Sequence, residues 1–160
     1  MLVVVCGLPG AGKTTVARTV ADRLGADLLR TDVIRKELFP DPDYTDAEAR
    51  AVYRELLDRA ADRAADGDVV LDATFHKRDF REWAADAADA VDAELRVVKV
   101  ECDEEVVKER IRAREGDESD ADVRVHELFR ETYDPLETDH ETVDNSGPEA
   151  ETKRAVGDLF

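Results

Sequence analysis

The residues with the clearest chemical potential are Gly7-Leu8-Pro9-Gly10-Ala11-Gly12-Lys13-Thr14, whose types and spacing are those of a phosphate-binding loop, or P-loop. Glycines in such a loop let backbone N–H groups turn inward around an anion without Cβ clashes. Lys13 can reach the β- and γ-phosphates of ATP, and the Thr14 hydroxyl can ligate Mg²⁺. We therefore expect ATP and Mg²⁺ as cofactors, with the nucleotide contacting Gly7, Leu8, Pro9, Gly10, Ala11, Gly12, Lys13, Thr14 and Thr15.

The segments on either side of this loop supply the context that the motif needs. Residues 2–6 form an apolar run that predicts a buried parallel strand. Val16, Val20 and Ala21 recur at helical spacing after the loop, and the N-terminus of that helix adds partial positive charge. A chance glycine turn is the alternative, but it would not bring the full spacing together with both flanks.

Asp32 and Arg35 form a second candidate group, directly after a predicted strand at residues 26–30. Thr31 can cap a short helix, on which Asp32 and Arg35 share a face because they are three residues apart. The carboxylate could accept the proton of an attacking hydroxyl, and the guanidinium could bind an anionic group of the acceptor. An ordinary surface ion pair between the two is the alternative.

A third acidic position, Asp72, follows the buried run Val69-Val70-Leu71. An Asp at such a strand end resembles a Walker B residue, which holds the metal directly or through a water. Thr74, two residues on, is expected to line the substrate site. The alternative is a strand-end turn in which Asp72 caps Thr74 or Phe75.

Arg110 and Arg114 are four residues apart on a predicted helix and therefore face the same way. Two cations on one face can close over nucleotide phosphates and neutralise developing charge. The alternative is a salt-bridged helix in which these arginines pair with Glu105, Glu109 and Glu115.

Several other polar residues have weaker signals. The segment Asn145-Ser146-Gly147-Pro148 either lines the base pocket or forms a plain turn. His76, His126 and His140 have no partner at metal-ligand spacing, so we expect none of them to be a metal ligand and interpret His76 as a loop residue. Cys6 and Cys102 are expected to be two buried reduced thiols.

The hydrophobic pattern alternates between strands and helices along the whole chain. Such alternation predicts an α/β fold, a three-layer αβα sandwich with a mainly parallel sheet of about five strands. The expected strands are 2–6, 26–30, 69–71, 95–100 and 142–144. The expected helices are 14–24, 31–39, 45–65, 77–91, 104–114, 122–130 and 149–160. At 160 residues, a single domain spanning 1–160 is expected.

The charge is strongly acidic, with 40 Asp and Glu against 23 Lys and Arg and a net charge of −17. Because the acidic residues are spread along the chain, we interpret them as the solvated surface of a protein from a salt-loving organism. Such a charge argues against nucleic-acid partners, although molar salt shortens the Debye length to about 3 Å and weakens that argument. No apolar run is long enough to span a membrane, so a cytoplasmic protein without membrane or obligate protein partner is expected.

Taken together, the motifs resemble the P-loop kinases grouped as AAA-family ATPase-like or zeta-toxin-like kinases. The resemblance covers nearly the whole chain and rests on Gly-x-Pro-Gly-x-Gly-Lys-Thr, Asp32-x-x-Arg35, Leu71-Asp72-Ala-Thr, Arg110-x-x-x-Arg114, Ser119-Asp120-Ala121 and Val143-Asp144. The pattern is most similar to the 5′-kinase domain of polynucleotide kinases, and the same scaffold resembles gluconate kinases, chloramphenicol phosphotransferases and zeta toxins.

The resemblance implies a nucleoside-monophosphate-kinase-like P-loop architecture with a small helical lid at about 108–130. It implies transfer of the γ-phosphoryl group of ATP to a hydroxyl of a small molecule or of a polynucleotide 5′ end. Lys13, Asp32 and Arg114 would act in catalysis, with Asp32 as general base and Arg35 holding the acceptor. Arg110 would contact ATP. A regulatory ATPase without an acceptor, in which Asp32 would position water, is the alternative function.

Overall fold

The computed structural model describes residues 1–115 and 119–160, with side chains described for residues 1–114 and 122–160. The side chains of Glu115 and of the segment 119–121, both named above, therefore lie outside the described residues.

Five parallel strands form one sheet in the order β2-β3-β1-β4-β5. Their bounds are β1 Leu2–Cys6, β2 Asp27–Arg30, β3 Val69–Asp72, β4 Leu95–Glu101 and β5 Glu141–Asp144. Every residue of β1 is buried, as expected for a central parallel strand that is covered on both faces. The predicted α/β class and parallel sheet are confirmed.

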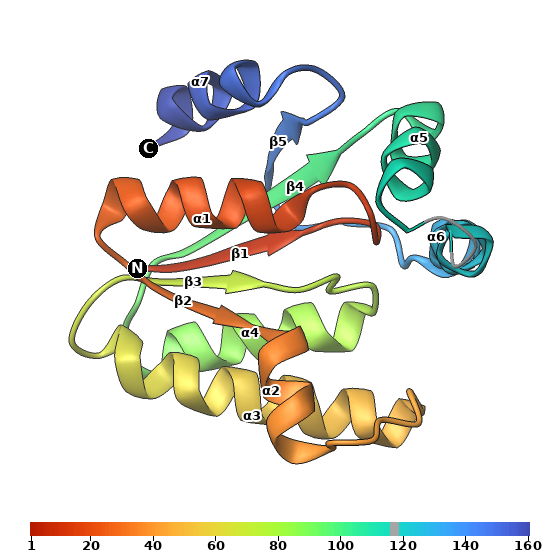
Figure 1. Cartoon of the computed structure of the whole chain (residues 1–160). Helices are drawn as coiled ribbons and strands as arrows, with labels where there is room; N and C mark the ends of the chain where they lie inside the picture. The colour runs from red at the N-terminus through yellow and green to blue at the C-terminus, as the bar shows by residue number, and fades with distance from the viewer. Residues whose placement is uncertain (116–118) are drawn as a thin grey trace.

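Helices cover both faces of the sheet (Figure 1). On one face lie α1 Lys13–Leu24 and α7 Glu149–Leu159, which pack on the side chains of Val3 and Val5. On the other lie α2 Thr31–Leu38, α3 Asp46–Ala64 and α4 Arg78–Ala90. The core of that second face includes a stacked pair of rings, Tyr53 and Phe80, whose centroids are 4.0 Å apart.

Two further helices, α5 Glu104–Glu115 and α6 Ser119–Thr132, stand beyond the carboxyl ends of the strands (Figure 1). Val107, Ile111 and Val123 form a small apolar cluster between them, separate from the two cores of the sheet. The α5–α6 pair coincides with the segment expected to act as a lid. Within the described part of the chain, no helix is both long and apolar enough to span a membrane.

Two local predictions need correction. Thr31 is the first residue of α2 rather than its cap, because the extended residue at the N-cap position is Arg30. Cys102 is only partly buried, unlike Cys6, although both cysteines are free. Thr45, the first residue of the expected helix 45–65, caps α3 instead, since its hydroxyl accepts a hydrogen bond from the Glu48 N–H at 3.2 Å.

Candidate active site

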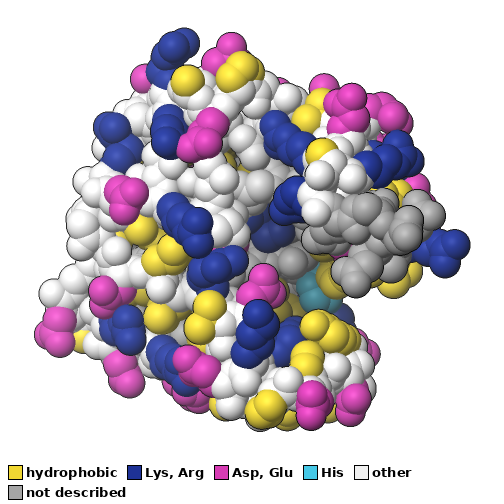
Figure 2. All heavy atoms as spheres, in the orientation of Figure 1, with side chains coloured by type: hydrophobic (Ala, Val, Ile, Leu, Met, Phe, Trp, Pro, Cys, Tyr) yellow, Lys and Arg dark blue, Asp and Glu magenta, His cyan; other side chains and the backbone are white. Residues whose placement is uncertain are grey.

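A cavity of about 870 Å³ opens at the carboxyl edge of the sheet, between the strand ends and the α5–α6 pair. Carboxyl edges of parallel sheets are the usual position of α/β binding sites. Figure 2 shows a hollow beside this pair, with Lys and Arg side chains gathered at its rim. The cavity therefore offers positive charge on a molecule whose net charge is −17.

At Gly7 and Gly12 of the P-loop, a side chain would collide with a different neighbour in each case. A Cβ on Gly7, whose φ is +144°, would lie 2.5 Å from the Val100 carbonyl oxygen. A Cβ on Gly12 would lie 2.0 Å from Nδ2 of Asn145, and the φ of Gly12 is +86°. Asn145 donates from Nδ2 to the Ala11 carbonyl at 2.9 Å, so it holds the loop against β5. This role was not visible in the sequence.

The residues of the P-loop are divided between two cavities, one on each side of the loop. Of the predicted nucleotide contacts, Pro9, Gly10, Gly12, Lys13, Thr14 and Thr15 line the main cavity. Gly7, Leu8 and Ala11 instead line a second cavity of about 580 Å³ on the outer side. Lys13 donates from Nζ to the Leu8 carbonyl at 2.9 Å, and burial lowers its pKa against the opposing charge of Asp72.

Thr14 and Asp72 lie together, as the predicted metal ligands should. The Thr14 hydroxyl donates to Oδ2 of the buried Asp72 at 2.7 Å. A hydroxyl and a carboxylate are oxygen donors of the kind Mg²⁺ prefers, so this pair fits the ion, bound directly or through water. The described residues contain no group of three or more His, Cys, Asp or Glu side chains that could hold a metal by themselves. The alternative for Asp72, a cap on Thr74 or Phe75, is not formed, since the Asp72 carboxylate accepts from Thr14 and Arg30 and the Phe75 N–H donates to Tyr53.

Arg30 joins this pair, although no motif includes it. Its Nε donates to Asp72 Oδ2 at 3.0 Å, and its Nη2 donates to Thr14 Oγ1 at 3.3 Å. The Arg30 guanidinium therefore contacts both predicted metal ligands.

Asp32 and Arg35 both line the cavity but do not pair with each other. The exposed Asp32 carboxylate lies 4.0 Å from Nη2 of Arg30. Arg35 lies 3.6 Å from the buried Glu48 carboxylate and 5.2 Å from the centre of the Tyr44 ring. The predicted alternative, a surface ion pair between Asp32 and Arg35, is therefore wrong.

Thr74 and His76 line the cavity from the loop after β3. The Thr74 carbonyl accepts a hydrogen bond from the Tyr133 hydroxyl at 2.7 Å. Between them, Phe75 has a left-handed φ of +49°, and its N–H donates to the Tyr53 hydroxyl at 2.9 Å. Burial, and secondarily the neighbouring Lys77 ammonium, lowers the pKa of His76 from 6.5 to about 4. His76 is a loop residue, as predicted, and is neutral at neutral pH.

Arg110 and Arg114 both line the cavity from α5, as their spacing predicted. Arg110 donates to the Gly147 carbonyl at 3.2 Å, beside the loop that follows β5. Among the described side chains, neither arginine pairs with Glu105 or Glu109, which were the expected alternative partners. Asn145 and Gly147 also line this end of the cavity.

His126 makes a contact that the sequence did not indicate. The residue lies on α6 and is buried, and its Nδ1 is 2.7 Å from the Pro9 carbonyl oxygen. Because a carbonyl only accepts, Nδ1 carries the proton. This contact ties the α5–α6 pair to the P-loop. It joins residues 117 positions apart, and no local pattern signals it.

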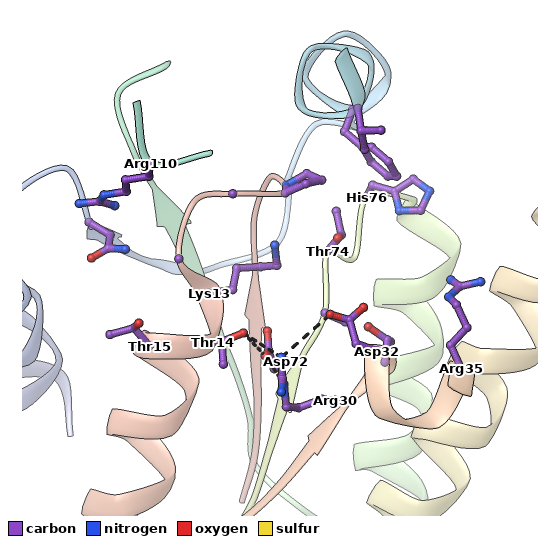
Figure 3. Close-up of a pocket in the computed structure, with 18 of the residues that line it drawn as sticks. Lys13, Thr14, Thr15, Arg30, Asp32, Arg35, Asp72, Thr74, His76 and Arg110 are labelled. Carbon is purple, nitrogen blue, oxygen red and sulfur yellow. Dashed lines mark hydrogen bonds and ion pairs between the residues drawn. The ribbon is translucent and has the colours of Figure 1, made fainter. Parts of the chain in front are cut away.

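The labelled side chains lie in two groups on opposite sides of the cavity, with a third group between them (Figure 3). Thr15 and Arg110 lie on one side of the view. Asp32, Arg35 and His76 lie on the other. Lys13, Thr14 and Asp72 lie between them. The cavity thus has two groups of polar side chains, one on each side of Lys13, Thr14 and Asp72.

Solved structures with the same fold include several kinases. A gluconokinase from Sinorhizobium meliloti 1021 superimposes with a TM-score of 0.73 and 24% identity, covering 98% of this chain and 91% of that chain. The Mycobacterium tuberculosis APS kinase, in complex with AMPPNP and APS, superimposes with a TM-score of 0.78 and 21% identity, covering 99% of this chain and 95% of that chain. A sugar kinase from Janibacter superimposes with a TM-score of 0.70 and 24% identity, covering 99% of this chain and 93% of that chain.

Sequence comparison adds a family and curated relatives. Uncharacterised proteins of Mycobacterium tuberculosis and Mycobacterium bovis are 32% identical across 99% of this chain. The chain spans only 34% of the length of these relatives. The family described as AAA domain matches residues 2–136. The chain therefore belongs to the AAA domain family and has the α/β fold of P-loop kinases.

Proposed function

We propose that the protein is an ATP-dependent kinase that transfers the γ-phosphoryl group to a hydroxyl of a small molecule or of a polynucleotide 5′ end. One observation carries the proposal: a single cavity holds Lys13 and Thr14 of the P-loop near its centre and Asp32 and Arg35 on the side away from Arg110. A protein that only binds nucleotide needs the first subsite but not the second. The fold shared with a gluconokinase and an APS kinase supports the same reading.

The proposed roles follow the geometry. Lys13 and the loop amides hold the nucleotide phosphates. Thr14 and Asp72 would hold Mg²⁺, which when bound neutralises phosphate charge. On the acceptor side, Asp32 takes the proton of the attacking hydroxyl and Arg35 orients the acceptor. Catalysis is then mainly positioning and charge stabilisation.

The α5–α6 pair supplies the remaining proposed groups. Arg110 and Arg114 reach the cavity from α5, where closure of this pair would bring them onto the nucleotide phosphates. His126 and Val107 already contact the P-loop at Pro9 and Gly10, so the pair is in position to move against the loop. We propose that it acts as the lid of a single 1–160 kinase domain.

A phosphoryl-transfer screen tests the proposal. γ-Labelled ATP is offered in molar KCl with sugars, nucleosides, antibiotics and 5′-hydroxyl oligonucleotides, and labelled products are separated. We expect label to move to one acceptor class in the wild type and not in Lys13→Ala. ATP hydrolysis that needs Lys13 but is unaffected by every acceptor would instead identify a regulatory ATPase.

A further inference from the structure

Arg30 is the one cation that touches both predicted metal ligands in the described structure. It is the last residue of β2 and the register neighbour of Asp72 on β3. This pairing places its side chain at the carboxyl edge of the sheet, where the guanidinium reaches Asp72 Oδ2 and Thr14 Oγ1 at 3.0 and 3.3 Å. Figure 3 shows the three side chains together below Lys13.

These contacts engage Thr14 Oγ1 and Asp72 Oδ2, one oxygen atom from each predicted metal ligand. Asp72 Oδ2 accepts hydrogen bonds from both Thr14 and Arg30, so its lone pairs are engaged. The Asp72 side chain is only 6% exposed, and water therefore does little to compensate its charge. Arg30 supplies that compensation, and a divalent cation at the same carboxylate would do so in its place.

Arg30 also has an alternative partner within reach. Its side chain is 27% exposed, and Nη2 already lies 4.0 Å from the Asp32 carboxylate. A small rotation of the Arg30 side chain would replace its contact with Asp72 by one with Asp32. The guanidinium would therefore keep a carboxylate partner after it leaves Asp72. The guanidinium is thus both bound and displaceable.

We propose that Arg30 is a place-holding cation for the metal site. In the nucleotide-free protein it occupies the oxygen atoms of Thr14 and Asp72, and it withdraws from Asp72 when a divalent ion arrives with the nucleotide. Metal binding without nucleotide is therefore suppressed, and Asp72 stays compensated in both states. The inference rests on the metal site of the proposed function, but it needs neither an acceptor nor turnover.

Metal binding without nucleotide gives the first test. Mn²⁺ is titrated into the wild type, Arg30→Gln and Arg30→Lys at one fixed molar KCl concentration, which screens the surface carboxylates. Arg30→Gln removes the competing charge and should bind one Mn²⁺ at least about tenfold more tightly than the wild type. Arg30→Lys keeps the charge and should behave like the wild type.

The double variant Arg30→Gln/Asp72→Asn locates the new site. It should lose the Mn²⁺ gained by Arg30→Gln, because the carboxylate is gone. Equal Mn²⁺ affinity in the wild type and Arg30→Gln would overturn the proposal, as would a gained ion that survives in the double variant. Circular dichroism of each variant establishes that it is folded before the titration is interpreted.

A measurement on the wild type does not depend on how the variants fold. The Nε–H of Arg30, assigned from through-bond NMR spectra, should exchange slowly with solvent in the free protein and with AMPPNP plus EDTA. Adding Mg²⁺ with AMPPNP should accelerate that exchange at least about tenfold, because the hydrogen bond to Asp72 is broken. Unchanged protection with Mg²⁺ and AMPPNP bound would overturn the proposal. The Mn²⁺ titration and the Nε–H exchange can both be interpreted even if no acceptor is found. The proposal for Arg30 and the proposed kinase activity can therefore be refuted separately.

Discussion

Asp32 is an exposed carboxylate in the first turn of α2, where two roles are physically reasonable. As a helix N-terminal residue its loss should cost about 1 kcal/mol of stability and little activity. As the general base, its replacement in Asp32→Asn should lower kcat by about 10²-fold or more, with nearly unchanged ATP affinity. Steady-state kinetics with the identified acceptor, together with thermal melts, separate the two roles.

The contrary outcome for Asp32→Asn is equally specific. A kcat near that of the wild type with a lowered melting temperature would make the carboxylate structural. Another group, with Asp72 the nearest candidate, would then have to activate the hydroxyl.

Arg35 should contribute to binding rather than to chemistry. Its guanidinium lies over the Tyr44 ring and near Glu48, which two backbone N–H groups hold in place. Arg35→Ala should raise the KM for the acceptor more than it lowers kcat, because an orienting contact is lost before the chemical step. Arg59→Ala is the matched control, since Arg59 pairs with Glu37 and Glu55 outside the cavity. A fall in kcat alone would contradict the orienting role.

His76 makes stability depend on pH in a defined direction. Its pKa is about 4 in the folded protein against 6.5 ordinarily, chiefly because of burial. Between these values the unfolded chain binds a proton that the folded protein does not, so stability falls as pH decreases from 6.5 to 4. Denaturant unfolding across this window should show a shallower fall in His76→Gln than in the wild type. Parallel curves would show that His76 does not contribute.

At the scale of elements, the α5–α6 pair is the least anchored part of the described fold. Its own cluster contains only Val107, Ile111 and Val123, and α5 packs on the P-loop at Gly10, where a Cβ would lie 2.8 Å from Val107. Small clusters open at lower free energy than central strands do. Amide hydrogen exchange should therefore be faster in α5 and α6 than in β1.

Nucleotide should change that exchange. AMPPNP with Mg²⁺ is expected to slow exchange in α5 and α6 in the wild type but not in Lys13→Ala, since the lid arginines then have no bound phosphate to contact. Exchange in the pair that is as slow as in β1 without nucleotide would contradict a mobile lid.

The elements also show which features a sequence can predict. The buried run Leu2–Cys6, the P-loop and the strand-end position of Asp72 follow from local pattern plus the rule for parallel sheets, and the structure contains all three. Arg30 was missed because a residue at the end of a strand has no motif, and the register with β3 gives it its partner. The cap prediction for Thr31 failed because Arg30 remains extended and takes the N-cap position.

The site features that the sequence did not predict depend on contacts between segments far apart in the chain. Asn145 is held between Ala11 and Thr152, and His126 meets Pro9 across 117 positions. Neither contact leaves a periodicity or a spacing in the chain, because it depends on how β5 and α6 are placed around the P-loop. The lid, the proposed roles of the site residues and the acceptor therefore stay predictions.

For the whole molecule, the net charge of −17 should dominate the response to salt. Ion pairs such as Arg59 with Glu55 weaken in salt, but exposed pairs contribute little. Screening the mutual repulsion of the carboxylates should outweigh that loss. The melting temperature should rise steeply between about 0.1 and 2 M KCl, as the Debye length falls from about 10 Å to under 3 Å. A flat or falling curve would refute the halophilic interpretation.

Both chain ends lie at the edge of the sheet opposite the cavity (Figure 1). The Met1 amino group donates to Asp68 at 2.8 Å, and the Phe160 ring lies under the Arg96 guanidinium at 3.9 Å. A polypeptide joined to either end would therefore begin at the edge of the sheet opposite the cavity. In this geometry a larger polypeptide could include the fold with neither junction next to the cavity. A residue joined before Met1 would remove the ion pair between the Met1 ammonium and Asp68, because the amino group would become a peptide N–H.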